Sequence, residues 1–179
     1  ITVTDVTNVT NVTVENVSNV QMYQIQGSDK WTVNTTASDL GCEATNGICN
    51  LTFIATDTVF NVNNSVVLGI VVDDVNPDVS SPQINDSDRI VQSTTPLNLN
   101  ITAADTNGIA NVTVENITNI QMYQIDASTK WTTNTTAADL GCESTNGICN
   151  LTFIATDNAD NVNDSIVLGI IVDDLPPSV

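Results

Sequence analysis

Three kinds of side chain in this sequence could carry chemistry: asparagines in Asn-x-Ser/Thr triplets, two pairs of cysteines, and a large number of carboxylates. Histidine is absent from the 179 residues. An imidazole general base, a Ser-His-Asp or Cys-His nucleophile and a histidine-ligated metal are therefore excluded. Paired carboxylates are the machinery of glycosidases, but here they fall in expected turns, with no predicted cleft and no aromatic subsites. We expect no enzymatic activity and no catalytic residues.

The asparagine triplets are the most abundant motif. Thirteen asparagines precede x-Ser/Thr, where composition alone would give roughly five, so the excess predicts a densely N-glycosylated surface. A strand surface that is simply rich in threonine and asparagine is the alternative. Strand alternation places Asn100 and Asn111 on polar faces, whereas Asn116 falls near the face of Val112 and Val114. The candidate sites are Asn8, Asn11, Asn16, Asn34, Asn50, Asn63, Asn85, Asn100, Asn111, Asn116, Asn134, Asn150 and Asn163.

The cysteines form two equally spaced pairs, Cys42 with Cys49 and Cys142 with Cys149, and each pair brackets six residues that include Asn-Gly. Such a turn can bring the two thiols together, and closing so short a loop contributes about 2.5 kcal/mol in the chain-entropy model. A four-cysteine metal site is the alternative, but it lacks the Cys-x2-Cys knuckle. We predict two local disulfides, which place the protein outside the cytoplasm.

Twenty-one acidic residues face three basic ones, giving a net charge of −18. This charge repels nucleic acid and anionic membrane surfaces, so neither is an expected partner. The longest apolar run, Val66 to Val72, is too short to cross a bilayer, and we expect no direct membrane insertion in this segment.

Most carboxylates therefore lack a cationic partner and must be hydrated, hydrogen-bonded or metal-bound. Asp73 and Asp74 end the last strand of the first half, and Asp105, Asp157 and Asp160 fall in turns of the second half. Oxygen ligands of this kind suit Ca²⁺. We predict a calcium site where the halves join, with a hydrated acidic linker as the alternative.

The chain is a tandem repeat with a period of one hundred residues. Residue 1 aligned on residue 101 gives roughly two thirds identity over 79 shared positions without a gap. We expect one module over residues 1–79, lacking its first strand or strands, and a complete module over residues 80–179. The first copy is either a window cut from a longer array or part of a subunit that takes the missing strand from a neighbour.

Val, Ile and Thr dominate the composition, which predicts an all-β protein. The outer side of the doubly apolar strand that ends at Val172 should be covered, either by the long connection within the same module or by a neighbouring subunit. Trp31 and Trp131, with Tyr23 and Tyr123, should pack in the core and at its rim. The break in alternation at Glu115–Asn116 indicates a bulge or a strand end. The strands expected in the second copy cover residues 97–103, 109–114, 120–125, 130–133, 149–156 and 165–172, which suits a two-sheet sandwich.

These residues resemble a known family. Gly108-Ile-Ala-Asn-Val-Thr-Val114, Trp131, Ala155-Thr-Asp-Asn-Ala-Asp-Asn161 and Ile170-Ile-Val-Asp-Asp-Leu-Pro-Pro177 are similar to the immunoglobulin-like repeats of prokaryotic cell-surface proteins. Asp160 stands where that family usually has Gly, and the first copy has Thr58-Val-Phe60 there. The resemblance implies tandem immunoglobulin-like β-sandwich modules with a spacer, adhesive or lattice-forming role, and the dense triplets point to an archaeon.

We therefore expect a structural component of an extracellular assembly, such as a surface layer, sheath or filament, whose partners are copies of itself. N-linked glycans and Ca²⁺ are its expected attachments. An adhesin that contacts a host or a neighbouring cell through its loops is the main alternative. The accessory stalk of a secreted hydrolase is a third.

Overall fold

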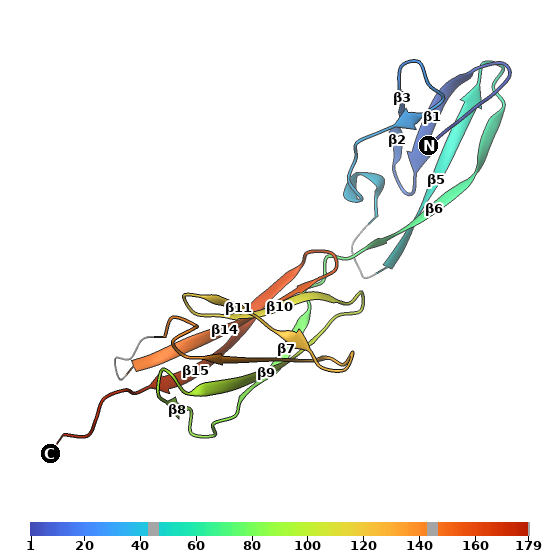
Figure 1. The fold of residues 1–179 in the computed structure, drawn as a ribbon. Coiled ribbons are helices and arrows are strands. Elements are labelled where there is room, and N and C mark those ends of the chain that lie inside the picture. Colours follow the sequence, from blue (N-terminus) through green and yellow to red (C-terminus); the bar gives the residue numbers. More distant parts are fainter. Residues whose placement is uncertain (43–46, 143–146, 179) are drawn as a thin grey trace. The chain divides into compact units, whose positions relative to one another are not determined.

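The Val-, Ile- and Thr-rich segments form strands, and the protein is all-β apart from one 3-10 turn among the described residues. A computed structural model describes residues 1–42, 47–142 and 147–178. They form two compact units, Ile1–Asp74 and Val75–Val179 (Figure 1). The boundary lies before β7 (Asp78–Ile84) rather than after Val79, because β7 pairs with a strand of the second unit.

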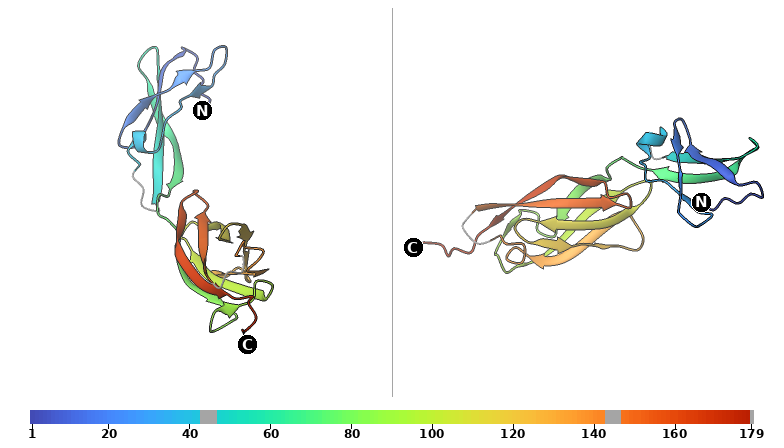
Figure 2. Two further views of the ribbon diagram at one scale, coloured as in Figure 1. Left: turned by 90° about the vertical axis from the view of Figure 1, so that its left-hand side faces the viewer. Right: turned by 90° about the horizontal axis from the view of Figure 1, so that it is seen from above.

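The second unit is a sandwich of two sheets (Figure 2). One sheet has the strand order β11-β10-β14-β15-β8, and the other has the order β12-β13-β9-β7. Apolar side chains from both sheets form one core between them. The strands are β7 (Asp78–Ile84), β8 (Ile90–Val91), β9 (Pro96–Ala104), β10 (Ile109–Glu115), β11 (Asn119–Gln121), β12 (Tyr123–Gln124), β13 (Lys130–Thr136), β14 (Gly147–Asp157) and β15 (Val162–Val172).

β9 shows how the sequence directs this packing. Leu97, Leu99 and Ile101 are buried, while Asn98 and Asn100 between them are partly exposed. This alternation is what a strand with one face on the core requires, and it confirms the strand predicted there.

The predicted strand over residues 120–125 is instead two short strands in different sheets. β11 pairs with β10, whereas β12 pairs with β13. Met122 lies between them, with its side chain buried and its N–H donated to the carbonyl of Val112 at 2.9 Å. The Gln121 amide donates to the carbonyls of Val112 and Met122 at 3.1 and 2.8 Å, which satisfies backbone acceptors where the chain changes sheet.

The strand end expected at Glu115–Asn116 is confirmed, because Glu115 ends β10. The irregularity of that strand lies elsewhere, between Ile109 and Asn111, where the register with β14 shifts. β7 and β8 were not expected from the sequence. β7 contains a proline and a register shift between Ser80 and Gln83, and β8 is a two-residue strand parallel to β15. Neither segment shows a sustained alternation.

The first unit repeats the pairings of β10 to β15 of the second unit. Its main sheet has the order β2-β1-β5-β6, and β3 and β4 form a separate pair. Each pairing has the register of its counterpart one hundred residues later, as in Thr13 opposite Gln21 and Thr113 opposite Gln121. The elements are β1 (Val9–Glu15), β2 (Asn19–Gln21), β3 (Tyr23–Gln24), β4 (Trp31–Thr32), the 3-10 turn η1 (Ser38–Leu40), β5 (Gly47–Asp57) and β6 (Val62–Val72).

Candidate functional site

Both predicted disulfides are present. Cys42 is bonded to Cys49 and Cys142 to Cys149, with Cα–Cα distances of 5.7 and 5.8 Å. The alternative of a four-cysteine metal site is therefore wrong, because each sulfur is bonded to its local partner. The turns predicted at residues 43–46 and 143–146 lie outside the described residues. Disulfides of this kind indicate an extracellular or surface protein.

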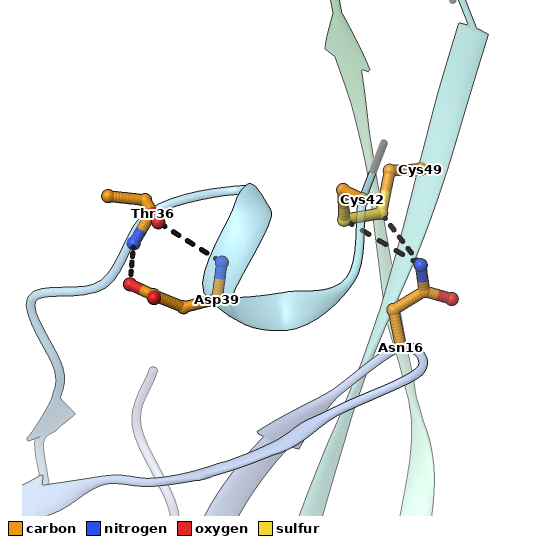
Figure 3. The surroundings of a disulfide bond; sticks show 5 residues. All are labelled: Asn16, Thr36, Asp39, Cys42 and Cys49. Carbon is orange, nitrogen blue, oxygen red and sulfur yellow. Dashed lines mark hydrogen bonds between the residues drawn. A yellow bond between two sulfur atoms is a disulfide. The ribbon is translucent and has the colours of Figure 1, made fainter. Parts of the chain in front are cut away.

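Each disulfide joins the start of a long hairpin strand to the segment before it, and Figure 3 shows this for Cys42 and Cys49. In the first unit, η1 leads into Cys42, and β5 carries Cys49. The Thr36 N–H donates to the Asp39 carboxylate, and the Asp39 N–H donates to the Thr36 hydroxyl, both at 3.1 Å. Hydrogen bonding from Thr36 lowers the pKa of Asp39. The Asn16 amide donates to Cys49 Sγ at 3.2 Å, so the residue after β1 also contacts the disulfide.

All the predicted glycosylation asparagines are accessible to some degree. Asn11, Asn100, Asn111 and Asn163 are partly exposed, and the other nine are exposed. Asn116 lies just after the end of β10 and is exposed, although strand alternation placed it near the core face. The triplets therefore lie where a transferase could reach them, and their occupancy stays a prediction.

Asp157 organises a turn in the second unit. Its side chain is buried, and one carboxylate oxygen accepts the N–H groups of Ala159 and Asn161 at 2.7 and 2.9 Å. The other oxygen accepts the Asn161 amide at 2.9 Å. Burial raises the pKa of Asp157, but these three hydrogen bonds outweigh it and leave the pKa below its usual value. Asp157 is therefore a structural carboxylate that holds the β14–β15 turn.

Asp57 plays the same part in the first unit. Its oxygens accept the N–H groups of Val59 and Asn61 and the Asn61 amide, at 2.9, 2.8 and 2.7 Å. Its pKa is lowered in the same way, with burial opposed by these hydrogen bonds and by one from Thr7. Both copies of the turn are thus built on one carboxylate.

The predicted calcium ligands are only partly brought together within a unit. Asp105 and Asp157 each place a carboxylate oxygen within 4.8 Å of the other. Asp105 also accepts the Asn107 N–H at 2.7 Å. Asp160 is exposed in the turn that follows, and Asp73 and Asp74 come directly after β6 in the first unit. Ca²⁺ takes six to eight oxygens, with backbone carbonyls and waters among them, and calcium binding at these carboxylates stays a prediction.

The turn keeps a left-handed backbone even without the glycine that the resemblance leads one to expect. Asp160 has φ of 67°, and Phe60 in the first unit has φ of 69°. Aspartate tolerates this region through local hydrogen bonding, but a bulky aromatic residue is disfavoured there. Phe60 is also 85% exposed, so the strained position carries an apolar side chain into solvent.

The outer face of the last hairpin is not covered by its own unit, so of the two expected sources of cover the connection within the module is wrong and a neighbouring subunit stays a prediction. Ile148, Ile171 and Ile90 are cross-strand neighbours and are all exposed. The chain before β9 does reach this sheet, but β8 extends its edge instead of lying over its face. The two tryptophans are buried as predicted, while Tyr23 and Tyr123 are mostly exposed.

Comparisons with known proteins identify no family for the chain, because neither a family model nor a curated protein matches it. Fibronectin(III)-like modules of CbhA from Clostridium thermocellum are similar at 19% identity and a TM-score of 0.44, covering 96% of this chain and 82% of that one. The D00-D0 domain of intimin is similar at 12% identity and a TM-score of 0.30, covering 96% and 88%. SGBP-B of Bacteroides ovatus, solved with a mixed-linkage heptasaccharide, is similar at 11% identity and a TM-score of 0.26, covering 96% and 41%.

None of the helical segments in the described residues has the length and apolar character needed to cross a membrane. The fold assignment depends on the strands and sheets of the chain itself.

Proposed function

We infer that this protein is a structural component of an extracellular assembly, such as a surface layer, sheath or filament, built from glycosylated immunoglobulin-like units. The observation that carries this proposal is the distribution of the glycosylation triplets. All thirteen lie on accessible positions of disulfide-bonded β units, so glycans can be attached without opening the fold.

The proposed mechanism is mechanical and steric, with no catalytic step. Long hairpins such as β14–β15 provide stiff elements, and each disulfide ties the start of the hairpin to the rest of its unit. Glycans and a net charge of −18 would keep the surface hydrated, and the charge would repel other polyanions. Three basic residues in the whole chain leave few sites for trypsin-like proteases.

Electron microscopy of native material, combined with intact-mass measurement, tests this proposal. We expect ordered sheets or regular fibres and a mass well above the 19.0 kDa of the bare polypeptide. Isolated, irregular particles at the bare mass would overturn it.

An adhesin is the second candidate, and one observation favours it. The turn after β5 in the first unit exposes Val59 and Phe60 at 61% and 85%, where the second unit has Ala159 and Asp160. An apolar loop tip is a common contact for a partner protein. Phe60→Asp tests it: an adhesin would lose cell binding, whereas a purely structural component would assemble as before.

A further inference from the structure

The outer face of the last hairpin exposes apolar side chains to the same extent in both units. Ile148 on β14 is 74% exposed, and its counterpart Ile48 on β5 is 73% exposed. Val167 on β15 is 52% exposed, and its counterpart Val67 on β6 is 56% exposed. This apolar outer face is therefore a property of the hairpin itself, and contiguous apolar surface of this kind marks a contact.

A glycosylation triplet lies in the middle of this face. Asn150 alternates along β14 with the buried Cys149 and Leu151, so its side chain points outward and is exposed. The Asn116 amide donates to its backbone carbonyl at 2.9 Å, but no described residue forms a hydrogen bond with the Asn150 side chain. The amide nitrogen that would carry a glycan is thus accessible.

A glycine leaves room beside that amide. Gly169 lies directly opposite Asn150 in the pairing of β14 with β15, and its φ is not in the left-handed region. A Cβ placed on Gly169 would lie 3.6 Å from both Asn150 Oδ1 and Ile148 Cγ2, so a side chain would fit there in ordinary contact. Glycine weakens the interior of a strand, and it often marks a place that another group approaches closely. The space over Gly169 is therefore a feature that needs an occupant.

The gap over Gly169 has apolar walls. Along β15 it lies between Val167 and Ile171, whose side chains share the outer face. Across the ladder, Ile148 lies opposite Ile171. A pyranose ring is suited to such a gap, because its C–H groups form apolar patches while its hydroxyl groups stay in water. A sugar attached to the neighbouring asparagine can bury these walls without leaving polar groups unsatisfied.

We propose that the first sugars of an N-linked glycan on Asn150 lie over Gly169 and cover the apolar outer face, and that a glycan on Asn50 does the same in the first unit. In the attachment step Asn150 Nδ2 forms a bond to the anomeric carbon of a lipid-linked oligosaccharide. The bond from that carbon to the lipid phosphate breaks, the phosphate leaves with the electron pair, and one amide proton passes to a base of the transferase. This proposal rests on the proposed function, because it requires a glycosylated protein.

A glycan fits this face better than a neighbouring subunit does. Sheets that pack face to face lie about 10 Å apart, and side chains fill the space between them. A glycan on Asn150 would occupy that space, so the two kinds of cover exclude each other here. The glycan is also attached covalently, so it does not lose the translational freedom that a separate partner loses on binding. An assembly of glycosylated chains would then use other surfaces for its contacts.

Asn134 provides a matched control. It is also an exposed triplet asparagine inside a strand, β13, but the surface around it is polar. Asn98 lies opposite it and donates its amide to Asn134 Oδ1 at 2.8 Å, and Thr132 and Thr136 lie two positions away along the strand. A glycan on Asn134 has no apolar surface to cover, and it should extend into water.

Hydroxyl-radical labelling read by mass spectrometry measures the cover. Wild type, Asn150→Gln and Asn134→Gln are secreted from a host that glycosylates the triplets, and glycopeptide analysis establishes which are occupied. In wild type we expect Ile171 and Val167 to be labelled as weakly as the buried Ile170. Labelling of both should rise in Asn150→Gln, because the glycan is lost, and should stay at the wild-type level in Asn134→Gln.

Gly169→Val tests whether the sugar lies in the gap itself. Valine is favoured in strands, so without glycosylation the melting temperature of the second unit should rise by about 4 °C. In chains that carry the glycan the valine takes the place of the sugar, and the melting temperature should fall instead. Trp31→Phe leaves Trp131 as the fluorescent reporter of this unit. The second unit is chosen because a Cβ at Gly69 would lie closer to its neighbours, at 3.2 Å from Ile48 Cγ2.

Three outcomes would overturn the proposal: an unoccupied Asn150 in native protein whose other triplets carry glycans, equal labelling of Ile171 in wild type and Asn150→Gln, or a rise in melting temperature in both forms of Gly169→Val. An unoccupied Asn150 together with weak labelling of Ile171 would show that a neighbouring subunit covers the face. Only native protein without a glycan on any triplet would overturn the proposed function as well, so the two failures are distinguishable.

Discussion

Truncating one leucine in each copy of the last hairpin tests the difference in cover directly. Leu168→Ala removes a side chain that is 3% exposed, and large-to-small changes at such positions cost about 2–5 kcal/mol, partly through the cavity left behind. Leu68→Ala removes a side chain that is already 50% exposed. No closed cavity forms there, and the expected cost is about 1 kcal/mol. The loss in the free energy of unfolding should thus be about threefold larger for Leu168→Ala than for Leu68→Ala.

Urea unfolding followed by tryptophan fluorescence measures the two units separately, since each has one tryptophan. Trp31→Phe leaves Trp131 as the reporter for Leu168→Ala, and Trp131→Phe leaves Trp31 for Leu68→Ala. Neither indole N–H has a hydrogen-bond partner among the described residues, so these replacements break no hydrogen bond. With a slope of about 1 kcal/mol per molar urea, the midpoint should fall by about 3 M for Leu168→Ala and about 1 M for Leu68→Ala.

Equal midpoint shifts for the two variants would refute this reasoning. They would mean that Leu68 is as well covered in solution as Leu168.

Three further predictions follow from the site geometry. Replacing Cys142 and Cys149 by Ala should destabilise the second unit by about 2.5 kcal/mol, measured by urea unfolding, and an unchanged midpoint would show that the bond does not constrain the unfolded chain. Asp157→Asn should destabilise the second unit at neutral pH. Because the pKa of Asp157 is lowered by folding, its contribution is complete above about pH 4 and is lost as the pH falls through the folded value, so the gap to wild type should narrow in acid. A gap in thermal melting that widened below pH 4 would contradict this sign. Glycopeptide mass spectrometry of native protein should find higher occupancy at Asn63, which is exposed, than at Asn163, which is partly buried and donates its amide to the Pro77 carbonyl at 2.8 Å. Equal occupancy would indicate that glycans are attached before the unit folds.

The sequence predicted those strands whose own residues alternate between core and solvent. β9 alternates leucine with asparagine, and the hairpin strands β14 and β15 are long and rich in Val and Ile, so each was located within a few residues. The disulfides were predictable because the two cysteines of each pair lie seven positions apart in the sequence, with Asn-Gly between them. The burial of Trp131 followed from its size and from its place in an expected strand.

Other features depended on contacts that no local pattern records. β8 is two residues long and owes its place to a parallel partner far along the chain, β15. The change of sheet at Met122 depends on hydrogen bonds from the neighbouring Gln121 to the backbone of β10 and of Met122 itself. The sequence could not decide whether the apolar outer face around Ile148 is covered within its own unit or by a neighbouring subunit, because the strand alone does not show what packs against it.

The two copies separate what a strand's own sequence decides from what its neighbours decide. β5 and β14 have the same eleven residues and the same register with the strands on both sides. Phe153 is nevertheless fully buried and Phe53 is not. The sequence of the hairpin therefore determines strand formation and pairing, whereas closure of the core in the second unit also depends on the residues of β7, β8 and β9.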